Sequence, residues 1–335
     1  VRIKMNNRLQ VDLCSFPSTM MLLKIVIVGS CIVPYSYSWL LSSSSLSHTH
    51  THLSLSVAGG EGDKERPPYA TIIGGKGRIG AALASAGNCL VVSSREDTID
   101  KNGSGPIFVA TRNDALDYII DTQCPKERHA DLVFVQNGYL DTYLESKNLL
   151  QSTTQVLLYL SVASKGIEPT DGVTSYNPEG LTKAYGKHAQ NFAQRLQALN
   201  LKCIVCTNQQ HEFLPAMYEK LMWIATYMLV GTANDCDSVG EASEKYTDQI
   251  ATIVKEMKYA IESKYEIVFE DGTFERLQSY TEVVADFPCG VKEFEWRNEF
   301  FWKLGDDLVP THNQLLRECS AKGKLPFDLP ATTTE

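Results

Sequence analysis

A single lysine, Lys220, lies within the apolar run PAMYEKLMWIATYMLVG, surrounded by Leu, Met, Trp, Ile, Tyr and Val. One interpretation is a helix residue that extends its charge along an apolar surface into water. The other is a proton donor, because hydride reduction of a carbonyl needs an acid beside the forming alkoxide. A second stretch, VKEFEWRNEFFWKL, carries Glu293 among aromatic residues. We expect its carboxylate to lie across a cleft from Lys220, where it could pair with the ammonium.

A glycine loop precedes these residues in the chain. Residues 75–80 read GKGRIG, a G-x-G-x-x-G that directly follows an apolar strand pattern and opens an Ala-rich helix pattern. In that context the glycines allow a tight turn, close approach to a pyrophosphate and close packing of helix on sheet. The helix N-terminus would supply free N–H groups for the phosphates. The predicted cofactor contacts of this loop are Gly75, Lys76, Gly77, Arg78, Ile79 and Gly80.

The end of the next strand predicts which dinucleotide is bound. About 20 residues after the loop an NAD-binding chain carries an acid that binds the ribose. Here the strand ends in Ser93, Ser94 and Arg95, and Glu96 follows. Hydroxyl groups beside a guanidinium suit a 2′-phosphate, since arginine binds phosphate oxygens bidentately. We therefore predict NADP(H) as the cofactor, held by Ser94 and Arg95, with Arg78 as a further candidate.

Two more polar loops follow predicted strands. Arg112 comes after the apolar run IFVA, and Asn137–Gly138 comes after LVFVQ. Asn-Gly is a common turn pair, so turn formation alone is one interpretation. However, ligands of parallel α/β sheets bind beyond the carboxyl ends of the strands. We therefore expect Arg112 and Asn137 to contact the cofactor as well.

The elements that must position these residues form two groups. From residue 69 to about 209, short apolar strands alternate with helical segments, which predicts a mostly parallel α/β sheet. Within this part, residues 181–199 (LTKAYGKHAQNFAQRLQAL) are predicted to form one helix. After residue 210 the strand signals nearly vanish. The segments 212–230, 241–264, 273–285 and 291–303 have helical periodicity.

Composition limits the function classes. The chain of 335 residues has 31 basic and 40 acidic residues, a net charge of −9. This argues against a general nucleic-acid surface. Nine scattered cysteines do not suggest a disulfide framework. Cys203 and Cys206 form a C-x-x-C, but they lie in a strand-like segment where residues three apart point to opposite faces. We predict no metal site.

Residues 1–66 differ from the remainder. No acid occurs between residues 13 and 60, and the apolar run MMLLKIVIVGSCIV precedes SSSSLS and HTHTH. These features suggest a targeting leader into a plastid, with a secretory signal or a cytoplasmic protein as alternatives. The HTHTH run suggests a low-complexity linker more than a metal site. We predict a leader over 1–66, a dinucleotide-binding domain over 67–209, a helical substrate domain over 210–322 and a disordered tail over 323–335, with no membrane contact in the mature form.

The order of these motifs resembles the ketopantoate reductase family, within the broader 6-phosphogluconate dehydrogenase-like group. The resemblance runs from about residue 69 to 319 and includes YEKL around Lys220, the Asn137–Gly138 pair and VPTHNQLL at 309–316. It implies a Rossmann domain followed by an all-α domain of the 6-phosphogluconate dehydrogenase C-terminal type. It also implies a catalytic Lys220, a substrate-binding Glu293, and Arg112 in place of a lysine. Substrate contacts would come from Asn298 and Asn313, and a homodimer is expected.

The chain also departs from this pattern. The family typically has asparagines four and eight residues after the lysine, where Ile224 and Met228 stand here. A polar site selects strongly for the groups it pairs, so these changes predict a different substrate. The sequence also resembles a branch of the group found in plants and algae. The favoured hypothesis is an NADPH-dependent reductase of a small oxo acid or carbonyl. The alternatives are a non-catalytic NADP(H)-binding protein and an enzyme that oxidises a hydroxy acid.

Overall fold

The computed structural model describes residues 2–5, 9–15, 21–27, 66–162 and 165–331. The chain divides into two units, residues 1–60 and 61–335. In the first unit, three strands form an antiparallel sheet in the order β1–β2–β3. They are β1 (Arg2–Met5), β2 (Leu9–Ser15) and β3 (Met21–Ile27). Most of the predicted leader, including HTHTH, lies outside the described residues.

The second unit begins with a seven-stranded sheet in the order β12–β11–β8–β7–β6–β4–β5. Its strands are β4 (Ala70–Ile73), β5 (Cys89–Val92), β6 (Ile107–Val109), β7 (Leu132–Phe134), β8 (Thr154–Leu157), β11 (Lys183–Tyr185) and β12 (Ile204–Val205). The five strands from β5 to β8 run parallel, whereas β11 pairs antiparallel with β8 and parallel with β12. A short ribbon pairs β9 (Leu160–Ser161) with β10 (Thr170–Asp171). The mostly parallel sheet predicted from the strand–helix alternation is confirmed.

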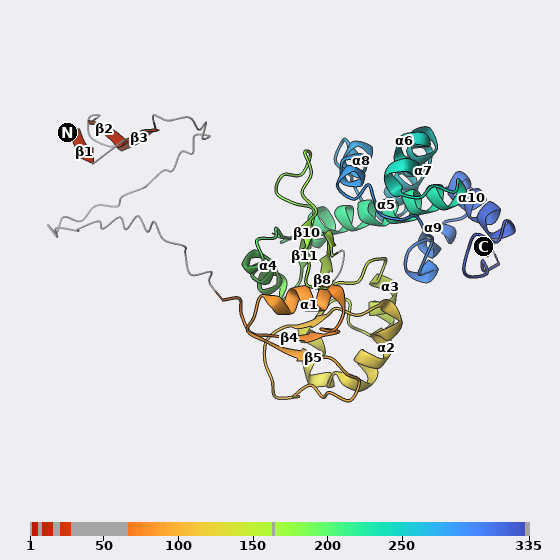
Figure 1. The fold of residues 1–335 in the computed structure, drawn as a ribbon, viewed down its shortest axis with the longest axis horizontal. Helices are drawn as coiled ribbons and strands as arrows, with labels where there is room; N and C mark the ends of the chain where they lie inside the picture. Colours follow the sequence, from red (N-terminus) through yellow and green to blue (C-terminus); the bar gives the residue numbers. More distant parts are fainter. Residues whose placement is uncertain (1, 6–8, 16–20, 28–65, 163–164, 332–335) are drawn as a thin grey trace. The chain divides into compact units, whose positions relative to one another are not determined.

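Alternate strand residues feed cores on the two faces of the sheet. Ile72 and Phe108 pack with Phe192 on one face, while Ile107 and Val109 belong to the core on the other. In Figure 1, α1 (Arg78–Ser85) and α4 (Ala189–Ala198) lie next to each other beside the sheet. The helices α2 (Leu116–Tyr118) and α3 (Asp141–Ser146) lie at a different side of it. The segment after β6 also includes the 3-10 helix η1 (Asn113–Ala115) and the π-helix η2 (Ile119–Gln123), and the 3-10 helix η3 (Lys126–Asp131) precedes β7.

The prediction of one helix over 181–199 is wrong in its first half. Residues 183–185 form strand β11, and the helix α4 begins only at Ala189. Gly186 separates the two, with φ of +118° and a position where a Cβ would lie 2.7 Å from the Thr153 carbonyl oxygen. Because β11 bridges β8 and β12, the sheet hydrogen bonds override the local helical pattern.

The remainder of the second unit is helical (Figure 1). It consists of the π-helix η4 (Gln209–Phe213), α5 (Leu214–Ala233), α6 (Val239–Lys245), α7 (Thr247–Tyr265), α8 (Thr273–Val283), the 3-10 helix η5 (Phe294–Trp296), α9 (Glu299–Trp302) and α10 (Pro310–Ala321). Helix α5 is buried on nearly all sides, so its apolar residues form the centre of the helical core. This explains why its sequence lacks a polar face. The predicted helical half is confirmed. However, the predicted segment 241–264 is divided into α6 and α7, and the predicted segment 291–303 contains only the short helices η5 and α9. Helix α10 is an addition to the predicted segments.

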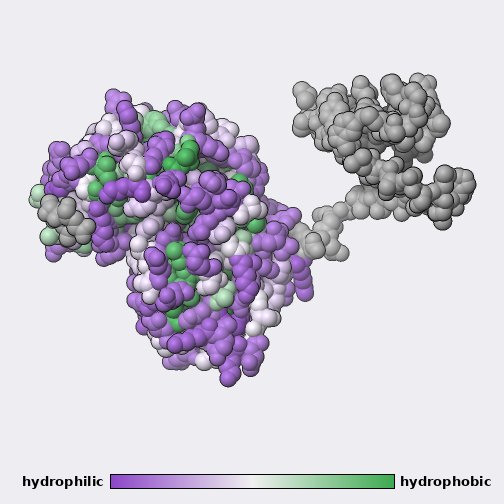
Figure 2. Space-filling model, turned by 180° about the vertical axis from the view of Figure 1, so that it is seen from behind, coloured by the Kyte–Doolittle hydropathy of each residue, from purple (hydrophilic) through white to green (hydrophobic). Residues whose placement is uncertain are grey.

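The surface shown in Figure 2 is mainly hydrophilic, with hydrophobic residues in small separate groups. None of the helices within the described residues is long and apolar enough to cross a membrane. Near the C-terminus, the ring centroids of Phe327 and Phe294 lie 5.1 Å apart, and Leu325 packs against the helical core. Within the predicted disordered tail, residues 323–331 therefore include packed side chains, and residues 332–335 lie outside the described residues.

Candidate functional site: a glycine loop and a buried lysine

The glycine loop joins β4 to α1, as predicted. A Cβ on Gly75 would lie 2.2 Å from a methyl of Val91, and one on Gly80 would lie 2.3 Å from the Gly74 carbonyl oxygen. Side chains are therefore excluded from both positions. Helix α1 begins after Gly77, and its first turn contains no acid. The N–H groups of the first turn of a helix have no partner within the helix, so this end of α1 suits a phosphate.

The loop after β5 lies beside the glycine loop, because the Gly74 N–H donates to the Val92 carbonyl at 3.0 Å. At the end of β5, one carboxylate oxygen of Asp97 accepts the N–H groups of Ser93 and Ser94, at 2.8 and 2.9 Å. These two hydrogen bonds lower the pKa of Asp97, with a smaller contribution from Lys76. The sequence interpretation overlooked Asp97, since its return to Ser93 depends on the conformation of the loop.

The predicted arginines of the cofactor site have protein contacts. Arg95 lies over the ring of Tyr118, with 5.0 Å between the guanidinium carbon and the ring centroid. Arg78 donates to the Val162 carbonyl at 3.0 Å. Arg112 forms an exposed ion pair with Asp114. Each of the three guanidinium groups therefore has a partner within the protein.

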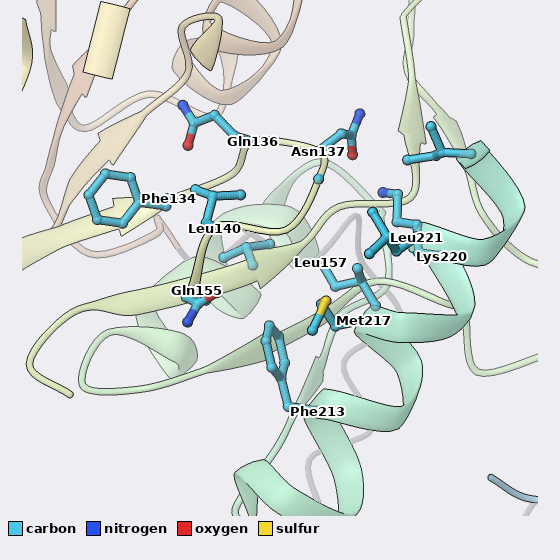
Figure 3. A pocket seen from close by; sticks show the side chains of 13 residues that line it. Phe134, Gln136, Asn137, Leu140, Gln155, Leu157, Phe213, Met217, Lys220 and Leu221 are labelled. Atoms are coloured by element: carbon cyan, nitrogen blue, oxygen red, sulfur yellow. The ribbon is translucent and has the colours of Figure 1, made fainter. Parts of the chain in front are cut away.

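Lys220 and the Asn137–Gly138 loop line one cavity of about 20 Å³, shown in Figure 3. The cavity lies between the carboxyl ends of β7 and β8 and the first half of α5. Its remaining lining is largely apolar and consists of Phe134, Gln136, Leu140, Gln155, Val156, Leu157, Phe213, Met217, Leu221 and Ile224. The structure thus brings a residue predicted for catalysis next to a loop predicted for cofactor binding.

The Lys220 ammonium is enclosed by protein. The side chain is 5% exposed, donates to the Leu158 carbonyl and places Nζ 4.3 Å from the centroid of the Tyr159 ring. Burial lowers the pKa of Lys220 to about 7, and the positive charge of Arg297 contributes to the shift. A lysine with this pKa exchanges a proton near neutral pH, as a general acid must. The surface-lysine interpretation is therefore excluded by the burial.

Glu293 pairs with Arg297, four residues later, and not with Lys220. Its backbone adopts a left-handed conformation, with φ of 51°. Arg297 is a second residue that the sequence interpretation missed, although the Glu–x–x–x–Arg spacing was visible in the chain. Its Nε is buried without a hydrogen-bond partner among the described residues. The Trp296 carbonyl accepts the Tyr139 N–H at 2.7 Å, which joins this segment to the Asn137–Gly138 loop.

Asn298 and Asn313 lie apart from the lysine cavity lining, in a buried network around His312. The two ring nitrogens of His312 contact the side-chain oxygens of Asn298 at 3.1 Å and Asn313 at 2.9 Å. Burial lowers the pKa of His312 to about 4, so its ring is neutral at physiological pH. Asn313 also donates to Asp306 at 3.0 Å. Both amides thus have partners within the helical half.

The two residues that depart from the ketopantoate reductase pattern, Ile224 and Met228, lie in different parts of the structure. Ile224 lines the cavity, whereas Met228 packs against the helical core. Gln136 lines the cavity with its amide nitrogen donating to the Val109 carbonyl at 2.8 Å and the Thr111 carbonyl at 3.2 Å. Its side-chain oxygen is buried without a partner among the described groups. This oxygen is a polar group that a bound molecule could contact.

Cys203 and Cys206 flank the short strand β12 and are free thiols. Burial raises the pKa of Cys203 to about 12 and also raises that of Cys206. Both thiols therefore remain protonated at neutral pH. Within the described residues, no group of His, Cys, Asp and Glu side chains is arranged to hold a metal ion.

No family model matches the sequence, and no curated protein matches it either. Among solved structures, the chain is similar to a PanE/ApbA family ketopantoate reductase from Ralstonia eutropha, with a TM-score of 0.56, 13% identity, and 76% of this chain and 98% of that chain covered. A D-mandelate dehydrogenase solved with NADH and anilino(oxo)acetate matches with the same four values, 0.56, 13%, 76% and 98%. A dimeric ketopantoate reductase from Staphylococcus aureus has a TM-score of 0.52 and 16% identity, with coverage of 76% and 99%.

These likenesses extend over nearly the whole length of each solved protein. At this level of identity they concern the arrangement of the backbone. Over 76% of its length, the chain shares the fold of the ketopantoate reductases and of D-mandelate dehydrogenase, a parallel α/β sheet followed by a helical region.

Proposed function

We propose that this chain is an NADPH-dependent reductase of a small 2-oxo acid or a related carbonyl compound. The observation that carries the proposal is the cavity shared by Lys220 and the Asn137–Gly138 loop. A cavity at the carboxyl ends of parallel strands is where such sheets bind ligands. Two solved proteins of the same fold add support, since one is called a ketopantoate reductase and the other was solved with NADH and an oxo acid.

In this proposal each group has a stated role. Gly75, Gly77 and Gly80 leave room for the pyrophosphate, and the N-terminus of α1 binds its oxygens. When bound, the nicotinamide supplies a hydride to the carbonyl carbon. Lys220 Nζ gives a proton to the carbonyl oxygen, so the product is a hydroxy acid and the lysine becomes neutral. Arg297, held by Glu293, keeps positive charge near Lys220 and favours an anionic substrate.

The finer assignments belong to the same proposal. Ser94 and Arg95 contact the 2′-phosphate, with Lys76, Ile79, Arg78, Arg112 and Asn137 in further cofactor contacts. Asn298 and Asn313 support the substrate side of the site through the network around His312. Because the cavity is lined by Ile224 in place of an amide, we propose a substrate with an apolar group at that point.

A panel of 2-oxo acids with NADPH tests this function. Lys220→Met is expected to lower the reduction rate by roughly 10²- to 10⁴-fold, because it removes the general acid. NADPH binding should remain, since Lys220 belongs to the carbonyl site. The matched control is Lys258→Met, which replaces a half-buried lysine on α7 that pairs with Glu262 and lies over the Phe269 ring. Full activity of Lys220→Met on the best substrate would remove Lys220 from the mechanism.

A non-catalytic NADP(H)-binding protein is the second candidate. The largely apolar lining and the small volume of the cavity favour it, because little room and few polar groups remain for a substrate. Under this alternative, NADPH binds but no member of the panel is reduced, and no hydroxy acid reduces NADP⁺. Reduction of NADP⁺ by a hydroxy acid would instead support the oxidative direction.

We further propose that residues 1–66 form a leader that directs the chain to a plastid, and that residues 67–209 and 210–322 are the cofactor and substrate domains. The acid-free composition of residues 13–60 supports the leader. A fluorescent fusion of residues 1–66 that stays in the cytosol would contradict plastid targeting.

A homodimer is also proposed, by analogy with the dimeric Staphylococcus aureus protein. Its mass by light scattering provides the test.

A further inference from the structure

The loop after β5 holds a negative charge at a place where a dinucleotide-binding chain reads the adenosine ribose. The Asp97 carboxylate accepts two backbone N–H groups through one oxygen, Oδ2, from Ser93 at 2.8 Å and Ser94 at 2.9 Å. Two neighbouring N–H groups that converge on one oxygen form an anion-binding nest. In this structure, the bound anion is part of the chain itself.

The buried side-chain amide of Gln123 fixes the conformation of this loop. Gln123 is 9% exposed, and its side-chain nitrogen donates to the Ser94 carbonyl at 2.9 Å and to the Asp97 carbonyl at 3.2 Å. The loop is also tied to the glycine loop, since Gly74 donates to Val92 at the end of β5. The nest therefore lies beside the phosphate-binding turn, and its two N–H groups have a fixed direction.

Two positive side chains belong to the same region. Lys76 of the glycine loop is close enough to act on the Asp97 carboxylate, and Arg95 lies between Ser94 and Asp97 in the chain. The Arg95 guanidinium rests over the Tyr118 ring, so its charge is turned toward Tyr118. Asp97 itself is exposed, and a small change in its side-chain rotamer would free both N–H groups.

We infer that Asp97 is a cofactor-selecting residue whose carboxylate occupies the 2′-phosphate position and must leave the Ser93–Ser94 nest when NADPH binds. This inference rests on the proposed dinucleotide site. A 2′-phosphate would compete with the carboxylate for the same N–H groups and would be repelled by its charge. An unphosphorylated ribose would instead meet the carboxylate as a hydrogen-bond acceptor for its hydroxyls. Asp97 therefore makes the preference for NADPH over NADH weaker than the other residues of the pocket would give by themselves.

The alternative is that Asp97 only closes a turn, with no effect on cofactor choice. The two cases differ in one measurable ratio, the affinity for NADPH divided by that for NADH. Asp97→Asn keeps a side-chain oxygen for the N–H groups and removes the charge. The matched control is Asp100→Asn, which removes the same charge from the same segment, where Asp100 accepts the Asn102 N–H at 2.9 Å.

The experiment is calorimetric titration of the full chain with NADPH, NADH, adenosine 2′-monophosphate and adenosine 5′-monophosphate. Asp97→Asn is expected to raise the NADPH/NADH affinity ratio by roughly tenfold, through loss of like-charge repulsion near the surface. It should tighten adenosine 2′-monophosphate similarly and leave the 5′-monophosphate unchanged. Asp100→Asn should change the ratio less than about twofold, because it lies outside the nest.

Two results would overturn the inference, and they are distinguishable. If both dinucleotides bind and Asp97→Asn leaves their affinity ratio at the wild-type value, Asp97 only closes a turn, and the proposed function stands. If the wild-type chain binds neither dinucleotide, the proposed function fails together with the inference. Circular dichroism of both variants shows whether the fold is retained, and Asp97→Ser, which removes the charge with a shorter acceptor, gives a second measure of the ratio.

Discussion

Position 220 places an ammonium group where water hardly reaches it. The Leu158 carbonyl and the face of the Tyr159 ring are its neighbours, and both favour a positive charge. Burial nevertheless outweighs them and brings the pKa down to about 7, with Arg297 as a second cause. A structural lysine would gain stability from a nearby carboxylate. The Glu293 carboxylate pairs with Arg297 instead. Lys220 is therefore able to release its proton.

The same shift makes a prediction about stability. The folded pKa of about 7 is below the ordinary 10.5, so between these values the unfolded chain binds more protons. The free energy of unfolding therefore rises with pH between about 7 and 10.5. Below pH 7 the buried lysine is charged, and its full destabilising effect is present. We expect Lys220→Met to stabilise the protein at pH 6 by on the order of 3 kcal/mol, and by less at pH 9.

Urea unfolding of the wild type and Lys220→Met at pH 6 and pH 9 measures this difference. Lys258→Met controls for loss of a lysine, because Lys258 pairs with Glu262 near the surface of α7. An equal stability change at both pH values would mean that Lys220 keeps an ordinary pKa in the folded chain.

The strand ends and the start of helix α1 build the proposed cofactor side. The glycine loop could be predicted from sequence because its residues must be small for local reasons. A Cβ on Gly80 would lie 2.3 Å from the Gly74 oxygen and 2.9 Å from the Gly75 Cα, both backbone atoms that cannot turn away. Helix α1 can pack on β4 only because position 80 has no side chain.

Gly80→Ala is therefore expected to displace the loop from the start of α1 and weaken NADPH binding by roughly tenfold or more, because the N–H groups lose their alignment. The control is Gly290→Ala in the helical half, where the nearest atom to an added Cβ is a flexible Lys292 carbon at 3.4 Å. Fluorescence titration with NADPH gives the affinities. An unchanged affinity of a folded Gly80→Ala variant would place the dinucleotide elsewhere.

Elements whose pairing depends on distant strands could not be predicted in this way. Residues 183–185 carry a helix-compatible pattern, yet they pair with β8 and β12, which lie elsewhere in the chain. Asp97 is a similar case, since its partners are the backbone of a loop and not a side chain in a motif. The pairing of Glu293 with Arg297 was available from the four-residue spacing, but a left-handed residue at Glu293 was not.

In the second unit, the α/β part and the helical part are in contact at Lys220 and at other points. The Tyr139 N–H donates to the Trp296 carbonyl, and Ser175 contacts Ser279 of α8 at 3.1 Å, so loops of the sheet touch the helical part at separate points. Helix α5 connects the two parts through the cavity it shares with β7 and β8. In the proposed reductase, the cofactor lies on the sheet side and Lys220 protonates the substrate from the helix side.

The pH dependence of NADPH-driven reduction of the best 2-oxo acid tests whether Lys220 is the general acid. We expect kcat/KM to be level below a pKa near 7 and to fall about tenfold per pH unit above it, because the protonated lysine is the acid. Lys220→Arg should remain slow at every pH, since arginine stays protonated. A wild-type profile without a break near pH 7, together with a Lys220→Arg variant as fast as wild type, would contradict it.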